Sequence, residues 1–268
     1  MSASGATAKA RPSVSLGGRF GGRHVVAVLS LVVILALWQV FGPAQPLFAS
    51  YPSAIFAAAV SITLPQILPA WGTTLVGFSV GLLIAIPLAI AIGVAMGRSR
   101  LIDTVLGPYV NALYVTPRIA LIPLLVLWFG LEFQLRVAIV VLSAIFPMIV
   151  NTYTGMRHVD RNLLDVGRVF TATRRQRLRT IVLPGAMPYI FAGLRIGTAR
   201  ALGGIIVAEM TASLTGIGRR LVNYGTFFEI DKMFVAIISI GIFGLLLTRS
   251  LVVLQRRAAP WTHAVRLR

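Results

Sequence analysis

The sequence predicts an all-α membrane protein with about six transmembrane helices. Hydrophobic residues make up 57% of the 268 residues and charged residues only 12%. Several uncharged runs are longer than a soluble core requires, which is typical of helices that cross a bilayer. A net charge of +18 could indicate a nucleic-acid or membrane-surface binder, but most of the arginines lie in the connections between the apolar runs. That distribution disfavours both classes.

The N-terminal part predicts a tail and a first membrane span. Residues 1–24 are rich in Ser, Gly and Ala and carry four basic residues, so we expect a cytoplasmic tail. Residues 25–41 are uncharged and long enough for the first transmembrane helix. A cleaved signal peptide is the alternative, but its apolar part would be unusually long. Residues 42–73 contain no charge and are expected on the outer face.

Residues 70–255 are predicted to form the core of the protein, and residues 256–268 a cytoplasmic C-terminal tail. Five apolar segments in the core predict the remaining spans, at 74–97, 104–131, 137–156, 186–209 and 233–254. The first of these carries two small-xxx-small pairs, Gly77 with Gly81 and Gly93 with Gly97. Such pairs let helices approach closely, although ordinary glycine use in membrane helices is the alternative.

The span at 104–131 is predicted to be broken. It contains Pro108, Pro117 and Pro123, with Arg118 also inside it. Irregular backbone at membrane depth is tolerated only where it is buried in protein or lines a cavity. Pro117, Arg118 and Pro123 are therefore candidates for a pathway wall or gate, and a kinked packing helix is the alternative.

The span at 186–209 contains three ionisable residues, Arg195, Arg200 and Glu209. Charges inside a span are rare and are functional candidates by default. The two arginines could attract an anionic solute, or they could reach toward the cytoplasm or bind loop carbonyls. Glu209 is expected near the outer end, on the helix face opposite Arg200, so these two should not pair within the helix.

The arginine-rich connection at 157–184 carries seven arginines and still shows helical periodicity. Four residues recur on one helix face: Leu163, Leu164, Gly167 and Phe170. Asp160 is the expected N-cap of this first short helix. Thr173, followed by Gln176, has the spacing of a capping box and predicts a second helix. Leu178 and Ile181 belong to the apolar face of that helix, and Pro184 is expected to end it.

The same connection resembles the cytoplasmic signature of ABC importer membrane subunits, E-A-A-x3-G-x9-I-x-L-P. The matching positions are Asp165, Gly167, Thr171, Ile181, Leu183 and Pro184. Asp replaces the Glu of the signature, Val-Gly replaces Ala-Ala, and Thr171 replaces the turn glycine. Residues 116–130 and 208–221 further resemble the nitrate/sulfonate/taurine branch of these permeases. The resemblance extends from Trp71 to Leu254.

This resemblance implies the type I ABC importer permease fold and a homodimer in the bacterial cell (inner) membrane. The dimer would form the translocation pathway for a small solute, such as nitrate, a sulfonate, taurine or a related compound. An external or periplasmic solute-binding protein would deliver the solute, and a separate ABC ATPase would dock on the 157–184 loop. The resemblance also places Glu209 and the turn at 216–218 in an outer gate or receptor-facing loop.

Nucleotide chemistry is expected on the partner, not on this chain. Neither Lys9 nor Lys232 follows a glycine, so the chain lacks a G-x-x-x-x-G-K-[ST] loop. We therefore expect a transport subunit rather than an enzyme. It would bind no cofactor itself, with ATP and Mg²⁺ held by the ATPase. Cysteine is absent and the three histidines lie far apart, so no metal site is expected.

The distribution of basic residues predicts the orientation. With both termini inside, the inner segments hold seventeen Lys and Arg residues and the outer segments four. This bias follows the positive-inside rule and places residues 157–184 in the cytoplasm. A self-sufficient secondary transporter or channel remains the alternative function. It would use ionisable residues or inverted repeats near the midplane.

Coupling to an ATPase would require a short, rigid cytoplasmic helix that fits a groove of the partner. Leu178 and Ile181 are expected to supply its apolar contact area. By resemblance, Asp165 helps to hold the loop. Thr171 would be strained at a positive φ, so either the loop turns differently or Thr171 acts as a cap. The alternative interpretation is a basic segment lying on anionic lipid, which leaves the I-x-L-P ending unexplained.

Overall fold

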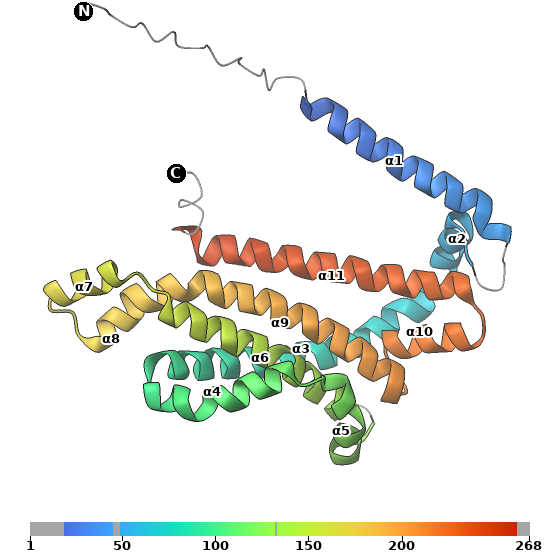
Figure 1. The fold of residues 1–268 in the computed structure, drawn as a ribbon. Coiled ribbons are helices and arrows are strands. Elements are labelled where there is room, and N and C mark those ends of the chain that lie inside the picture. The colour runs from blue at the N-terminus through green and yellow to red at the C-terminus, as the bar shows by residue number, and fades with distance from the viewer. Residues whose placement is uncertain (1–18, 45–48, 132, 262–268) are drawn as a thin grey trace, which may run out of the picture. The chain divides into compact units, whose positions relative to one another are not determined.

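The computed structural model describes residues 19–44, 49–131 and 133–261, and these residues form helices and no strands (Figure 1). The predicted all-α class is therefore confirmed. The expected tails at 1–24 and 256–268 lie largely outside the described residues. The chain divides into two compact units, with the boundary after Ala54.

The first unit contains α1 (Arg19–Phe41) and a short 3₁₀ turn (Gly42–Ala44). Two side chains of α1 fasten the segment that follows. The indole Nε1 of Trp38 donates to the Ser50 carbonyl at 2.7 Å, and the side-chain amide of Gln39 bonds to Ser53. The apolar part of α1, Val25–Phe41, coincides with the first predicted span.

The second unit carries the remaining helices, with α2 (Pro52–Ile62) crossing the boundary. The longer elements are α3 (Leu68–Arg98), α6 (Phe133–Arg157), α9 (Leu183–Ala212) and α11 (Ile230–Ala258). The shorter ones are α4 (Arg100–Val115), α5 (Ile122–Phe129), α7 (Arg161–Val169), α8 (Arg174–Arg177) and α10 (Ile217–Thr226).

Helix α6 is the centre of this unit, packed against α3 on one side and α9 on the other (Figure 1). Glycines allow this close packing. A Cβ atom added to Gly93 of α3 would lie 2.6 Å from the Thr152 Cβ atom of α6, and one added to Gly193 of α9 would lie 2.8 Å from that of Asn151. The predicted small-xxx-small pairs of α3 thus lie at a helix–helix contact.

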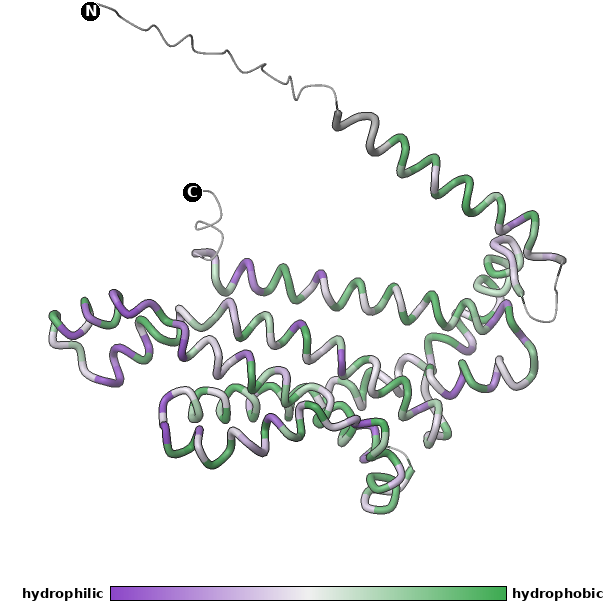
Figure 2. Tube along the Cα trace, viewed as in Figure 1, coloured by the Kyte–Doolittle hydropathy of each residue, from purple (hydrophilic) through white to green (hydrophobic). Residues whose placement is uncertain are grey.

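Five of the six predicted spans match apolar helices long enough to cross a membrane, if the bent pair below counts as one span, and the span at 25–41 matches a shorter apolar helix. Among the described residues, four helical stretches are long and apolar enough to cross a membrane: Pro52–Arg98, Phe133–Arg157, Arg174–Ala212 and Ile230–Ala258. A fifth candidate is a helix pair, Arg100–Val115 and Arg118–Phe129, bent by 93°. This pair confirms that the third predicted span is broken. Figure 2 shows hydrophilic residues gathering on α7 and α8, at one end of the long helices α6 and α9.

The prediction that Pro184 ends its helix is wrong, because helical structure runs without interruption from Arg174 to Ala212. A π turn, Leu178–Val182, joins α8 to α9. In it the Leu183 N–H donates to the Leu178 carbonyl, five residues back. The backbone hydrogen bonds thus follow the π-helical pattern just before Pro184, which has no N–H to donate. Pro184 is therefore accommodated in the first turn of α9.

Candidate functional site

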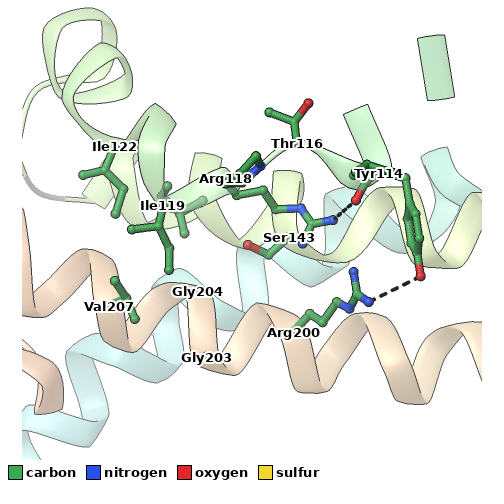
Figure 3. A pocket seen from close by; sticks show the side chains of 13 residues that line it. Tyr114, Thr116, Arg118, Ile119, Ile122, Ser143, Arg200, Gly203, Gly204 and Val207 are labelled. Carbon is green, nitrogen blue, oxygen red and sulfur yellow. Dashed lines mark hydrogen bonds between the residues drawn. The ribbon is translucent and has the colours of Figure 1, made fainter. Parts of the chain in front are cut away.

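A cavity of about 500 Å³ lies between the break in the third span and the two helices α6 and α9. Figure 3 shows the side chains that line it. The break itself follows from sequence, because a residue that precedes proline is disfavoured in the helical region. Thr116 accordingly has ψ of 129°, and α4 ends there. Arg118 follows at once in a 3₁₀ turn, Arg118–Leu121.

Two arginines, 82 residues apart in sequence, face this cavity from opposite sides (Figure 3). The Nη2 atom of Arg118 donates to the Tyr114 carbonyl at 3.1 Å. The Nη2 atom of Arg200 approaches the Tyr114 hydroxyl at 3.3 Å, and its guanidinium lies 5.0 Å from the centre of the Tyr114 ring. Both guanidinium groups therefore contact the same neutral residue, Tyr114.

The structure brings together three of the six predicted pathway residues, namely Pro117, Arg118 and Arg200. Pro123 is exposed in the first turn of α5, outside the cavity. Arg195 donates to the Gln255 side chain at 3.1 Å and so links α9 to α11. Tyr114 was missed by the sequence argument. Its only signal is a position one helical turn before Arg118.

Glu209 lies in a buried polar cluster at the other end of α9. Its carboxylate accepts from the Thr74 hydroxyl at 2.8 Å and from the Gly218 N–H at 3.0 Å. The same Thr74 oxygen accepts from the Ile217 N–H at 3.0 Å. Glu209 is fully buried and joins α3, α9 and the start of α10. Its geometry is that of a structural fastening.

Arg136 adds a second fastening to the same region. It lies in the first turn of α6, is 6% exposed, and donates to the Ser213 and Thr215 hydroxyls at 3.0 and 2.9 Å. The turn between α9 and α10 is thus held from α3 and α6 together. Neither Thr74 nor Arg136 carried a motif that could have indicated this role.

The loop at 157–184 forms two short helices whose caps follow the sequence. The Asp160 carboxylate accepts from the Asn162 N–H at 2.9 Å, and Thr173 and Gln176 form the predicted capping box. Asp165 is exposed and forms an ion pair with Arg168 at 2.7 Å. Gly167 is buried, and an added Cβ there would lie 2.8 Å from the Cδ1 atom of Ile181. The two helices therefore close on each other at Gly167.

The exposed apolar area of the loop lies on α7, because Leu178 and Ile181 are half-buried. Leu178 faces a smaller cavity beside the end of α3, and Ile181 packs on Gly167. Four apolar side chains of α7 and its C-terminus are each more than half exposed: Leu163, Val166, Val169 and Phe170. The first helix of the loop therefore exposes more apolar surface than Leu178 and Ile181 do.

Thr171 adopts a left-handed backbone conformation with φ of 53°. Its N–H donates to the Arg168 carbonyl, and the Ala172 N–H donates to the Gly167 carbonyl. This is the Schellman pattern that usually places glycine at the position of Thr171. Both expected alternatives are therefore wrong, because the glycine-type turn is kept and Thr173 is the cap.

Comparison with known proteins identifies the family. Residues 85–260 match the binding-protein-dependent transport system inner membrane component family. The chain belongs to this family. The permease is 33% identical to the aliphatic sulfonates transport permease SsuC of Escherichia coli (strain K12), over 72% of each chain. It is 29% identical to the taurine permease TauC of the same organism, over 88% of this chain and 89% of TauC.

Solved structures agree on the fold. The permease superposes on a chain of the MetNI methionine ABC transporter, in an inward-facing conformation, with a TM-score of 0.60 and 16% identity. The match covers 74% of this chain and 96% of that chain. The type I importer permease fold is therefore confirmed. The permease is the inner-membrane transport subunit of an ABC importer, and the self-sufficient transporter or channel is set aside.

Proposed function

We propose that the permease forms a homodimer that carries a small solute inward through the Arg118–Arg200 cavity. A separate ABC ATPase drives the cycle from the cytoplasm by docking on α7, and an external binding protein delivers the solute. The relatives are named for aliphatic sulfonates and taurine, which supports a solute of that group, with nitrate as the other small anion expected from the sequence.

The observation that carries this proposal is the connection between the loop and the cavity. Helix α7 follows α6 after a three-residue turn, and α8 continues into α9. Ser143 of α6 and Arg200 of α9 line the cavity, so the helices that receive a push on the loop are also the cavity walls. A rigid knob in an ATPase groove would therefore move both walls at once.

The exposed apolar face of α7 is suited to such a groove. Its four side chains are each more than half exposed, in a loop that carries seven arginines. Burying that much apolar surface against a partner would stabilise the complex by several kcal/mol. The positive-inside bias supports a cytoplasmic position for the loop and for both termini.

A second copy of the chain would complete the pathway. Helices α4 and α5, which border the cavity, expose large apolar side chains, with Val115 79% and Leu127 80% exposed. In the proposed homodimer these elements face the partner copy or lipid. ATP and Mg²⁺ are bound by the ATPase, and the permease supplies no nucleotide site. The lipid bilayer is the remaining partner, and no nucleic acid is involved.

Co-purification tests the assembly. The tagged chain is extracted from its native membrane in mild detergent, and mass spectrometry identifies the stoichiometric partners. We expect a P-loop protein near one copy per permease, and a particle that contains two permeases. A permease that purifies alone, with no associated ATPase at any detergent strength, would contradict the proposal.

A further inference from the structure

The geometry points to an amphipathic anion site in the cavity between Arg118 and Arg200. Its ligand is a small organic oxyanion with a short, uncharged, apolar tail, of the alkanesulfonate type. The two guanidinium groups bind the head, and the apolar end of the cavity takes the tail. This inference rests on the proposed function, because it assumes that the cavity belongs to the solute pathway.

The head site follows from uncompensated positive charge. Among the described residues that line the cavity there is no Asp or Glu, so neither guanidinium has a carboxylate there. Tyr114 accepts hydrogen bonds from both but neutralises neither. The Nε atom of Arg118 is buried without a hydrogen-bond partner. Two like charges facing one cavity repel each other, and an anion between them removes that cost. Guanidinium forks fit oxyanions in particular.

The tail site occupies the opposite end of the cavity. Figure 3 shows Ile119, Ile122 and Val207 on the side away from the arginines. Ile139 of α6 adds to this apolar lining. The cavity has free space beside Gly203, since an added Cβ atom there would meet nothing within 4 Å. A volume of about 500 Å³ suits a small solute with a few carbons.

These two ends discriminate between anions of similar charge. Nitrate or sulfate would satisfy the arginines but leave the apolar end filled with water. Taurine would bring an ammonium group into a cavity that already holds two cations and, along its described lining, no carboxylate. An alkanesulfonate satisfies both ends. The site therefore favours aliphatic sulfonates over the other solutes named for the family.

The test is direct binding to the purified permease–ATPase particle in detergent without nucleotide, measured by isothermal titration. The probes are methanesulfonate, ethanesulfonate, butane-1-sulfonate, taurine and nitrate. We expect affinity to rise about fourfold for each added methylene. We expect ethanesulfonate to bind more tightly than taurine, although the two have the same carbon chain.

Variants locate the site. Arg118→Gln and Arg200→Gln should each weaken butane-1-sulfonate binding by about 10- to 100-fold, the value of a charge-assisted hydrogen bond. Arg195→Gln is the matched control, because Arg195 lies on the same helix, is bonded to Gln255 and does not line the cavity. Gly203→Val has space for its side chain and should weaken butane-1-sulfonate more than methanesulfonate.

Three outcomes would overturn the site: affinity independent of tail length, taurine binding at least as tightly as ethanesulfonate, or unchanged binding in both cavity arginine variants. The length series and the taurine comparison use the unaltered chain, so they decide the question even if a variant fails to fold. ATPase activity of the same particle reports separately on coupling. Anion binding without coupled ATPase activity would contradict the proposed function but would still support the anion site.

Discussion

At the scale of single residues, Thr171 is the clearest conflict between sequence and local structure. A β-branched residue at φ of 53° is strained by roughly 1–2 kcal/mol relative to glycine. The loop keeps this turn because both Schellman hydrogen bonds and the buried contact at Gly167 depend on it. The strain is therefore compensated by neighbouring residues.

Thr171→Gly should stabilise the loop by up to about 1 kcal/mol, since relief of strain exceeds the added freedom of the unfolded chain. Thr173→Ala, two residues away, should destabilise it by about 1 kcal/mol, because it removes the capping box. Hydrogen exchange of the loop amides measures both effects. Equal shifts of the same sign would show that the turn does not have this geometry.

Glu209 makes a second prediction at this scale. Glu209→Gln should lower the unfolding free energy by about 1–3 kcal/mol, because one carboxylate oxygen that accepts from Thr74 or Gly218 becomes an amide donor. Thr211→Val is the control on the same helix, since that hydroxyl is exposed and bonds only to carbonyls of its own helix. Thermal unfolding of the purified permease measures both. A stable Gln variant would mean that the cluster is not a fastening.

At the scale of elements, α7 is notable for the apolar face that it exposes outside the long helices. Phe170→Asp should uncouple the ATPase from transport, since it places a charge at the C-terminal end of the proposed docking face, where Phe170 is 78% exposed. Because that side chain is exposed in the free chain, membrane insertion should be unaffected. The measurement is solute-stimulated ATPase activity in proteoliposomes. Phe170→Leu keeps an apolar surface and should retain most of it.

The elements also show how far sequence reasoning extends. Hydropathy predicted the long helices, and the prolines predicted a break in the third span, because both signals are local. The prolines did not fix its position, since Pro108 lies inside α4 and the break falls at Thr116–Pro117. The helix end expected at Pro184 failed because a π turn upstream accommodates the proline. The sequence argument placed the apolar contact surface of the loop at Leu178 and Ile181. The structure shows that Ile181 packs on Gly167, which leaves the larger exposed apolar surface on α7.

At the scale of the whole molecule, the candidate site depends on contacts that no local pattern encodes. Arg118 and Arg200 were each identified as unusual charges in a span, but their meeting across one cavity depends on how α4, α6 and α9 pack. The link between Thr74 and Glu209 is of the same kind, 135 residues apart in sequence. Sequence therefore identified several members of the site, and tertiary structure selected among them.

The uninterrupted helix from Arg174 to Ala212 has a mechanical consequence. It is one rod with the 157–184 loop at one end and Arg200 partway along it. At 1.5 Å per residue, Arg174 and Arg200 lie roughly 40 Å apart along the axis. A tilt of roughly 5° about the Arg174 end of such a rod would displace Arg200 by about 3–4 Å. The Arg200–Tyr114 contact is 3.3 Å long, so a stroke of this size would separate the pair. A few degrees of lever motion would thus be enough to release an anion held between the two arginines.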